Sequence, residues 1–387
     1  MTDTAAADCV LRQAVESGAV PGVVALAGTA AGPLYQGAFG ARGLADATPM
    51  SLDTVFAIFS MTKAVTSVAA MQLVEAGRLS LDAPLGEWCP HLAAPQVLEG
   101  FDEAGAPKLR PAKRAVTLRH LLTHTAGFSY NMWNPEVGRY MQVAGMPPAR
   151  SGKRAVLDMP LVFDPGERWQ YGINTDWVGQ VVEAVRGVPL PEVFARHVTG
   201  PLGMVDTAFV PGPAQQARRA GMHQRGADGA LAAIDWPVNA TPEFFGGGGG
   251  LFSTGTDYLR LIRMLLRGGE LDGARVLRPE TVALMGENHI GALEMEPMPT
   301  AIPSMSNDFH PFPAVPKNWG LGFMRNTQDL PGGRAAGSLA WAGLGNLYFW
   351  VDPARDVAGV LMTQVLPFGD PAVLELLAGF EAAIYAG

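Results

Sequence analysis

The sequence predicts an α+β fold in which a single antiparallel sheet is built from both ends of the chain. Short apolar runs bounded by turn residues occur at 22–39 and again at 346–365. The residues between these two regions show helical spacing of apolar side chains over several segments. If the two end regions share one sheet, the middle of the chain is an inserted, mostly helical part that packs beside it.

The N-terminal region is expected to contain a helix, a hairpin and a second helix. Residues 7–18 have the composition of a short helix, and 22–29 and 34–39 form the predicted hairpin around an Ala-Gly-Pro turn. Apolar residues recur at spacings of three and four over 61–76, and Gly77 is a suitable residue to end that helix. This second helix is the clearest helical pattern in the first half of the chain.

The middle of the chain predicts three more helices separated by long irregular stretches. The helices are expected at 118–126, 174–186 and 190–199. Residues 128–160 and 286–318 are rich in Pro and Met and follow neither a helical nor a strand period. Loops of this length in a compact domain are often lids or binding loops.

The last third of the chain opens on a run of five glycines at 246–250. No Gly-Lys-Ser/Thr follows this run, so it is not a phosphate-binding loop, and we expect a turn or a close backbone approach there. A capped amphipathic helix is predicted at 258–266, two strands at 346–351 and 357–365, and a final helix at 370–385.

Composition excludes several classes of partner. The chain has 387 residues, 28 Lys and Arg against 36 Asp and Glu, and a formal charge of −8, which disfavours nucleic acid and anionic membranes. Hydrophobic content of 48% with 17% charged residues predicts a well-buried globular protein. Cys9 and Cys89 are expected to be free thiols. Without an apolar N-terminal stretch or a run long enough to span a bilayer, we expect a soluble, cytoplasmic protein, and homo-oligomerisation stays open.

The tetrad Ser60-Met61-Thr62-Lys63 is the strongest chemical signal. Serine and lysine three residues apart at a helix start share one face, so their side chains can meet. A serine hydroxyl needs a neighbouring base to become a nucleophile, and a desolvated lysine can take part in that activation. The helix N-terminus adds backbone N–H groups that favour a developing oxyanion. The alternative is that Ser60 only caps the helix and Lys63 is solvated.

Other catalytic motifs are absent from the sequence. No serine lies in Gly-x-Ser-x-Gly, which argues against an α/β-hydrolase. His120 and His124 have the spacing of a zinc protease motif, but Leu121 stands where the glutamate would be. We therefore expect both histidines to be structural helix residues, and we expect neither a metal nor an organic cofactor.

Several separated blocks give the sequence a resemblance to a known superfamily. Besides the tetrad, these blocks are DTVFAIFSMTKAV, LRHLLTHTAGF, GGGGLFSTGTDYLRL and GNLYFWVDPARDVAGVLMTQ. Together they resemble the serine β-lactamases and penicillin-binding proteins, and most of all the class C β-lactamase-like esterases called family VIII carboxylesterases. The resemblance covers nearly the whole chain. It implies a class C β-lactamase-like fold, with an α/β part formed by 1–85 and 213–387, a helical part formed by 86–212, and the active site at their junction.

The second motif of that superfamily, Tyr-x-Asn, is only partly present. It maps to Tyr171-Gly172-Ile173, so Ile173 replaces the asparagine and Asn174 comes one residue late. A tyrosine beside Lys63 can act as a general base because a nearby cation stabilises the phenolate. The resemblance suggests a supporting acidic residue at Asp176. The alternatives are a core tyrosine and a surface carboxylate.

The third motif, Lys-Thr-Gly in the lactamases, maps to Trp341-Ala342-Gly343. This is the Trp-x-Gly variant of the family VIII enzymes, and the resemblance implies an oxyanion hole formed by the backbone N–H groups of Ser60 and Leu344. Gly343 would let the backbone approach the acyl carbonyl. The alternative for Trp341 is an ordinary strand aromatic.

The sequence differs from the superfamily at one residue of the second motif and one of the third, and both differences favour a neutral, apolar acyl substrate. Trp341 has no charge to hold a substrate carboxylate, and the missing asparagine removes an amide donor. The Met- and aromatic-rich stretches 128–147 and 286–319 would suit an apolar pocket, unless they only pack as loops. The candidate pocket residues are Tyr130, Trp133, Met141 and Trp319.

The expected activity is that of a serine esterase that hydrolyses short- to medium-chain carboxylic esters through an acyl-enzyme on Ser60. Lys63 and Tyr171 are the other expected catalytic residues. The alternatives are a β-lactamase, a D-amino-acid peptidase or another amide hydrolase, an acyltransferase of the same fold, and a non-catalytic scaffold.

Overall fold

The computed structural model describes residues 4–45 and 47–386; the predictions for 1–3, 46 and 387 lie outside this part of the chain. Its main element is a seven-stranded sheet with the order β11-β12-β13-β14-β15-β1-β2. The N-terminal strand β1 (Gly22–Gly28) pairs antiparallel with the C-terminal strand β15 (Val357–Met362), and Val24 lies opposite Met362. The predicted sheet from both chain ends is therefore confirmed.

The other strands of this sheet extend it on both sides of that central pair. They are β2 (Pro33–Gly40), β14 (Leu347–Asp352), β13 (Leu339–Gly343), β12 (Met324–Asn326) and β11 (Lys317–Trp319). β1, β13, β14 and β15 are buried along their whole length. They are buried because helices cover both faces of the sheet, and this explains why these strands have continuous apolar runs without alternation.

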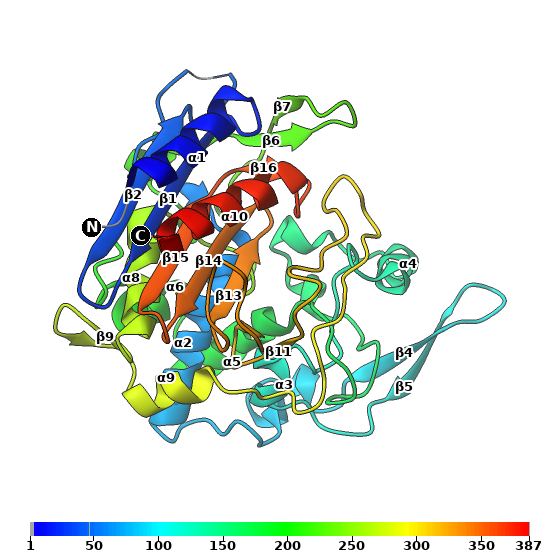
Figure 1. Cartoon of the computed structure of the whole chain (residues 1–387). Coiled ribbons are helices and arrows are strands. Elements are labelled where there is room, and N and C mark those ends of the chain that lie inside the picture. Colours follow the sequence, from blue (N-terminus) through cyan, green and yellow to red (C-terminus); the bar gives the residue numbers. More distant parts are fainter. Residues whose placement is uncertain (1–3, 46, 387) are drawn as a thin grey trace.

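Helices from distant parts of the sequence form the two outer layers (Figure 1). α1 (Thr4–Glu16) and α10 (Pro371–Ala386) lie together on one face of the sheet. α8 (Gly255–Leu266) packs on the opposite face against β1, β14 and β15, and α2 (Thr62–Glu75) lies beyond it. The prediction for α8 was sound because Thr254 caps it, with the side-chain oxygen accepting from the Asp257 N–H.

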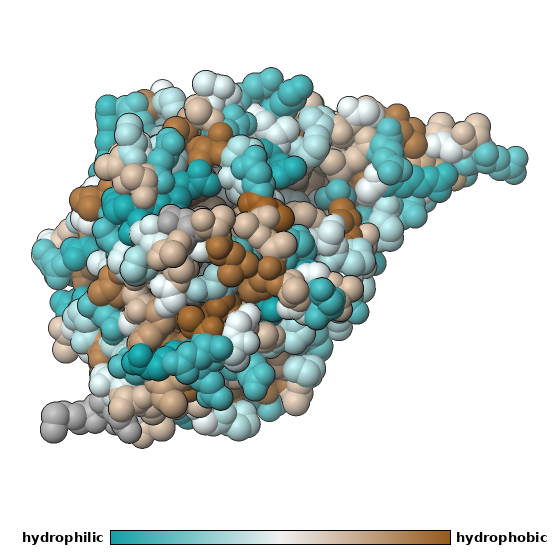
Figure 2. Space-filling view, turned by 90° about the horizontal axis from the view of Figure 1, so that it is seen from above, coloured by the Kyte–Doolittle hydropathy of each residue, from teal (hydrophilic) through white to brown (hydrophobic). Residues whose placement is uncertain are grey.

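The region 86–212 contains more helix than strand but also carries a hairpin. Its α-helices are α3 (Leu118–Leu122), α4 (Pro135–Val143), α5 (Asn174–Arg186) and α6 (Leu190–Phe194). α5 packs against α2 and α3. The hairpin of β4 (Gln96–Phe101) and β5 (Pro107–Pro111) projects from the body of the molecule (Figures 1 and 2). The boundaries of the two parts stay a prediction.

The remaining elements are short. They are β3 (Phe56–Ala57), β6 (Met222–Arg225), β7 (Leu231–Ile234), β8 (Phe252–Ser253), β9 (Glu270–Leu271), β10 (Ala274–Arg275), β16 (Val365–Leu366), α7 (Pro213–Gln216) and α9 (Pro279–Met285). Among the helices of the described residues, none is both long and apolar enough to cross a membrane.

Three sequence predictions differ from the structure in their details. The stretch 128–160 contains α4, which begins after Asn134 because that side chain accepts from two backbone N–H groups of the first turn. The helix predicted at 118–126 ends at Leu122, because the backbone of His124 has a φ of 58° and cannot continue it. The helix predicted at 190–199 changes after α6 into a π-helical turn over Ala195–Thr199.

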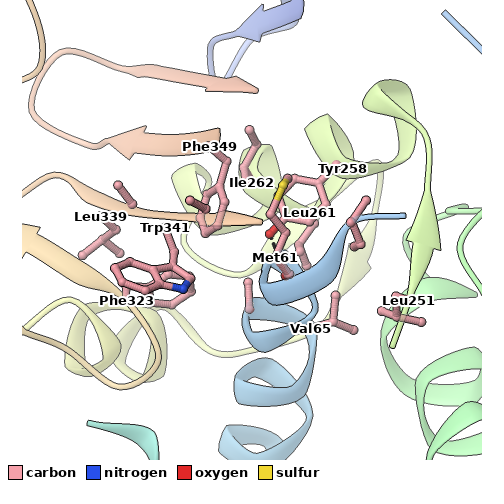
Figure 3. Packing of buried hydrophobic residues seen from close by; sticks show 14 of the residues in the cluster. Met61, Val65, Leu251, Tyr258, Leu261, Ile262, Phe323, Leu339, Trp341 and Phe349 are labelled. Atoms are coloured by element: carbon pink, nitrogen blue, oxygen red, sulfur yellow. Dashed lines mark hydrogen bonds between the residues drawn. The ribbon is translucent and has the colours of Figure 1, made fainter. Parts of the chain in front are cut away.

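The core holds the start of α2 against the sheet (Figure 3). Trp341 on β13 and Phe349 on β14 extend from the sheet toward the layer that contains Met61 and Tyr258. The buried Tyr258 hydroxyl donates a 2.9 Å hydrogen bond to the Met61 carbonyl. The residues next to Ser60 are thus fixed by both packing and a buried hydrogen bond.

Candidate active site

Ser60 lies in a 3-10 turn, Phe59–Met61, that leads directly into α2. Phe59 has a φ of 45°, a left-handed conformation that is costly for a bulky residue and is typically kept at functional sites. The flanking backbone is fixed by a 3.0 Å hydrogen bond from Ile58 N–H to the Leu251 carbonyl. Ser60 lines a cavity of about 880 Å³, so its hydroxyl is presented to a substrate-sized space.

Lys63 is buried, with 2% of its surface exposed, so the alternative of a solvated lysine is wrong. Its Nζ donates to Ser60 Oγ at 3.2 Å, to the Tyr130 hydroxyl oxygen at 3.3 Å and to the Gly248 carbonyl at 2.6 Å. The predicted contact between the serine and lysine side chains is present. The contacts with Tyr130 and Gly248 join segments that are distant in the sequence.

Tyr171 lies beside Lys63, and Lys63 Nζ faces the plane of the Tyr171 ring. Lys63 Nζ is 4.8 Å from the centre of the Tyr171 ring. The Tyr171 hydroxyl accepts a 3.0 Å hydrogen bond from Trp341 Nε1. The structure therefore brings Ser60, Lys63, Tyr171 and Trp341 together, as the motif mapping requires.

Asp176 and Tyr130 form a half-buried pair of an acid and a phenol next to Lys63. Asp176 accepts from the Gly248 N–H at 2.9 Å and lies near the Tyr130 hydroxyl. Desolvation raises the pKa of Asp176, while the Lys63 charge, the Gly248 N–H and the Tyr130 hydroxyl act in the opposite direction. Desolvation and the neighbouring Asp176 hold the pKa of Tyr130 well above its usual value, so Tyr130 is a neutral phenol.

The end of β13 reaches the nucleophile turn because Gly343 has no side chain. A Cβ atom there would lie 2.5 Å from the Ile58 carbonyl oxygen, two residues before Ser60. Leu344 follows Gly343 and lines the same cavity as Ser60. Ser60 and Leu344, whose backbone N–H groups are the predicted oxyanion hole, therefore lie in the wall of the same cavity.

Asn174, which comes one residue late in the second motif, directs its side-chain amide at His124. Asn174 Nδ2 donates to His124 Nδ1 at 3.0 Å, and Ile173 takes the place beside the cavity. His124 is buried, and burial followed by the charge of Lys63 keeps its pKa well below the usual value. The centre of its neutral ring lies 4.7 Å from the centre of the Tyr171 ring, so the two rings pack against each other.

Two of the four predicted pocket residues line the cavity, and two do not. Tyr130 and Trp133 lie in its wall. Trp319 is fully buried behind the wall, where its ring is 4.7 Å from that of Trp341 and Nε1 donates to the Leu122 carbonyl. Met141 lies on α4 outside the lining. The cavity lining leaves these two out, and the sequence could not show this because an aromatic or methionine beneath a pocket wall has the same sequence signature as one within it.

Much of the apolar cavity wall comes from side chains that the sequence does not single out one by one. They are Phe59, Trp236, Phe245, Met298, Ile302, Met305 and Phe368. Met298, Ile302 and Met305 belong to the stretch 286–319, which the sequence predicts to suit an apolar pocket. Figure 2 shows the molecule from above, and hydrophobic residues gather in the centre of the face seen there, with hydrophilic residues around most of them.

In the described ranges 4–45 and 47–386, no group of three or more His, Cys, Asp or Glu residues is placed to hold a metal ion. The polar groups that converge on the cavity are the hydroxyl of Ser60, the ammonium of Lys63, the phenols of Tyr130 and Tyr171 and the carboxylate of Asp176. This set is suited to covalent catalysis by an activated serine.

The fold and this site define a serine enzyme of the hydrolase and acyltransferase class. The family model of the beta-lactamases matches residues 7–383, and the chain belongs to the beta-lactamase family. The resemblance seen in the sequence is therefore confirmed at the level of family and fold.

Curated relatives include both acyl-transferring and ester-cleaving enzymes. Monacolin J acid methylbutanoyltransferase of Aspergillus terreus is 36% identical over 395 residues, covering 98% of this chain and 95% of that protein. Lovastatin esterase of Penicillium rubens is 34% identical over 394 residues, covering 98% and 97%. Unliganded simvastatin synthase of Aspergillus terreus superposes with a TM-score of 0.87 at 33% identity, covering 100% and 99%.

Proposed function

We propose that the protein is a serine esterase that takes a short- to medium-length apolar acyl group from a carboxylic ester onto Ser60 and releases it to water. The observation that carries this proposal is the 3.2 Å hydrogen bond between Lys63 Nζ and Ser60 Oγ at the wall of an apolar cavity. A buried lysine bound to a serine at a helix start is suited to nucleophilic catalysis.

In the proposed reaction, Ser60 Oγ attacks the ester carbonyl while Tyr171 takes the serine proton. The charge of Lys63 and the Trp341 N–H stabilise the phenolate form of Tyr171. The carbonyl electron pair moves onto oxygen, where the N–H groups of Ser60 and Leu344 stabilise it; one such donor contributes about 10²–10³ in rate. Tyr171 then protonates the leaving alkoxide, and a water molecule activated by Tyr171 releases the acyl group.

A second candidate is transfer of the acyl group to an alcohol. The cavity of about 880 Å³ is at the large end for a small-molecule site and has room for an alcohol beside a short acyl chain. Relatives whose names describe methylbutanoyl transfer and ester cleavage share the fold, and both reactions pass through the same first half. Which acceptor reacts with the acyl-enzyme is the difference between the two candidates.

Amide hydrolysis has less support. Trp341 offers no charge for the carboxylate of a β-lactam or peptide substrate, and Ile173 offers no amide. The cytoplasmic location and the expected lack of nucleic-acid and membrane partners stay predictions.

The test is intact mass spectrometry of the protein after brief exposure to a panel of activated esters of increasing acyl length. We expect a mass increase equal to one acyl group, mapped to the peptide that contains Ser60. Adding an alcohol acceptor to the acylated protein then separates the candidates: free acid indicates an esterase, and a new ester indicates an acyltransferase. An adduct on another residue, or none with any ester, contradicts the proposed function.

A further inference from the structure

The irregular stretch 286–318 contains a loop that is closed at its base by backbone hydrogen bonds. Met298 and Phe309 form an isolated antiparallel bridge, with a 3.0 Å hydrogen bond in each direction. The chain therefore leaves and returns at one point, and we call residues 298–309 the 298–309 loop. Compact loops whose ends lie together hold their side chains in defined positions and frequently carry function.

The 298–309 loop is also tied by its backbone to two other segments of the cavity wall. The Ala301 N–H donates to the Met132 carbonyl at 2.8 Å. The Phe368 N–H donates to the Met305 carbonyl at 2.9 Å. Because Met132 and Phe368 both line the cavity, these two hydrogen bonds hold the loop at the wall itself.

The part of the wall that the loop supplies is apolar. Met298, Ile302 and Met305 line the cavity, and the loop, all of whose residues the structure describes, contributes no other side chain to the lining. Met298 is buried, whereas Ile302 and Met305 are half-buried. Methionine and isoleucine offer apolar contact without a hydrogen bond, so this wall is suited to an apolar group of the substrate.

The 298–309 loop lies on the side of the cavity that contains Trp341 and Tyr171. Phe309 packs edge-on against Trp341 with 6.5 Å between the ring centres, and its ring centre is 4.6 Å from that of Phe368. Trp341 Nε1 in turn donates to the Tyr171 hydroxyl at 3.0 Å. The loop therefore packs on the residue that holds the hydroxyl which transfers protons in the proposed reaction.

Other segments build the wall beside the nucleophile turn. Phe59 packs edge-on against Trp236 with 5.5 Å between the ring centres, and Phe245 lies 5.2 Å from Phe209 in the same measure. All four side chains line the cavity, and none belongs to the 298–309 loop. The two sides of the cavity can therefore be altered separately.

We propose that the 298–309 loop contacts the alcohol part of the ester and selects for an apolar alcohol, with Ile302 and Met305 as specificity-determining residues. This inference rests on the proposed function. When the ester C–O bond breaks, the alcohol oxygen keeps the electron pair and takes the Tyr171 proton, so it must lie within hydrogen-bond reach of that hydroxyl. The rest of the alcohol then extends along the wall that the loop supplies. An alcohol that attacks the acyl-enzyme follows the same path in reverse and meets the same loop.

The test compares Ile302→Ala and Ile302→Trp with wild type in two ratios of kcat/KM. The alcohol ratio compares biphenyl-4-yl butyrate with phenyl butyrate, and the acyl ratio compares 4-nitrophenyl octanoate with 4-nitrophenyl acetate. We expect Ile302→Ala to raise the alcohol ratio and Ile302→Trp to lower it, each by at least ~10-fold, while the acyl ratio stays within ~3-fold of wild type. Met305→Ala should change the alcohol ratio in the same direction as Ile302→Ala.

The matched control is Ser304→Trp, which adds a large side chain at an exposed position of the same loop outside the cavity lining. Both of its ratios should equal those of wild type. Trp236→Leu alters the opposite wall and should leave the alcohol ratio in place.

Two results would overturn the inference. One is an alcohol ratio that stays constant in both Ile302 variants, and the other is an acyl ratio that moves as far as the alcohol ratio. The Ser60 adduct is measured on wild type with 4-nitrophenyl butyrate. A missing adduct shows that the proposed function has failed, whereas an adduct together with either of the two results overturns the role of the loop alone.

Discussion

Trp341 gives the Tyr171 hydroxyl a hydrogen-bond donor without adding a charge to the cavity wall. A lysine at this position would place a second cation in the cavity, whereas the indole places an apolar ring there and directs one N–H at the Tyr171 hydroxyl, 3.0 Å away. Its ring also packs 4.8 Å from that of Tyr171. The position therefore keeps a hydrogen-bond donor for the tyrosine while making the cavity less polar.

The first prediction concerns this hydrogen bond. Trp341→Phe keeps an aromatic ring but removes the donor, and a hydrogen bond to a group that becomes charged contributes about 1.5–3 kcal/mol. We therefore expect kcat/KM on activated esters to fall by roughly 10–100-fold. Steady-state kinetics measure the effect, and circular dichroism checks the fold. An unchanged kcat/KM would mean that the donor does not assist Tyr171.

The second prediction concerns the nucleophile. Ser60→Ala removes the atom that forms the acyl bond but leaves the packing of Met61 and the start of α2 intact. Turnover should fall by at least about 10³ with little change in melting temperature. Ester hydrolysis and thermal unfolding are measured on the same preparation. A variant that keeps substantial turnover would remove Ser60 from the mechanism.

At this scale the sequence predicts contacts that follow from local geometry and misses those that depend on the fold. The contact between Ser60 and Lys63 was predictable because both lie on one helical face. The contact of Tyr130 with Asp176 was not, because nothing in the local pattern places these two side chains together. Tyr130 was therefore predicted as a pocket residue, and its hydrogen bond with Lys63 emerged from the structure.

At the scale of elements, α8 links the sheet to the neighbouring loops through a buried carboxylate. Asp257, in the first turn of α8, accepts hydrogen bonds from the Asp206 N–H and the Thr207 hydroxyl. Burial raises the pKa of Asp257 to about 6. The folded protein therefore binds a proton at Asp257 between about pH 4 and pH 6 that the unfolded chain releases.

The third prediction follows from that proton. The Asp257 contribution to the free energy of unfolding should fall as pH rises from about 4 to about 6 and stay constant above that range. Asp257→Asn keeps an acceptor oxygen without the charge, so it should stabilise the fold at neutral pH by up to about 3 kcal/mol. Urea unfolding of both proteins from pH 4 to pH 8 measures the difference. A difference that does not vary with pH would contradict the prediction.

Elements with a strong local pattern were predictable, and those defined by their partners were not. α5 was predicted with its observed bounds, Asn174–Arg186, and α8 was recognised from its cap and amphipathic spacing. The β4–β5 hairpin was missed because its residues include two prolines and several charges and are half-buried or exposed over most of its length. The three-residue strands β11 and β12 are too short to show a period and depend on the sheet beside them.

At the scale of the whole molecule, a buried ion pair ties the C-terminal helix to the loop before β13. Arg334 donates to Glu381 on α10 through Nε at 2.8 Å and Nη2 at 2.6 Å, and both side chains are buried. A neighbouring carboxylate, Asp352 at the end of β14, accepts from the Ala335 N–H and the Tyr385 hydroxyl. The pair therefore lies where three distant segments meet.

The fourth prediction concerns this ion pair. Glu381→Ala leaves a buried guanidinium without its partner, so we expect the free energy of unfolding to fall by about 3–5 kcal/mol. The double variant Arg334→Met, Glu381→Leu removes both charges and should recover part of that loss. Chemical denaturation of the three proteins provides the comparison. Equal losses in the single and double variants would show that packing, and not the unpaired charge, determines the cost.

The pairing of β1 with β15 also determines when the molecule can fold during its synthesis. The hairpin of β1 and β2 is translated long before β15, its other neighbour in the sheet. Until then one edge of β1 is unpaired, and such edges favour association with other chains. A nascent chain that stalls before β15 would thus display an unsatisfied strand, and chaperones that recognise exposed edges are expected to bind it.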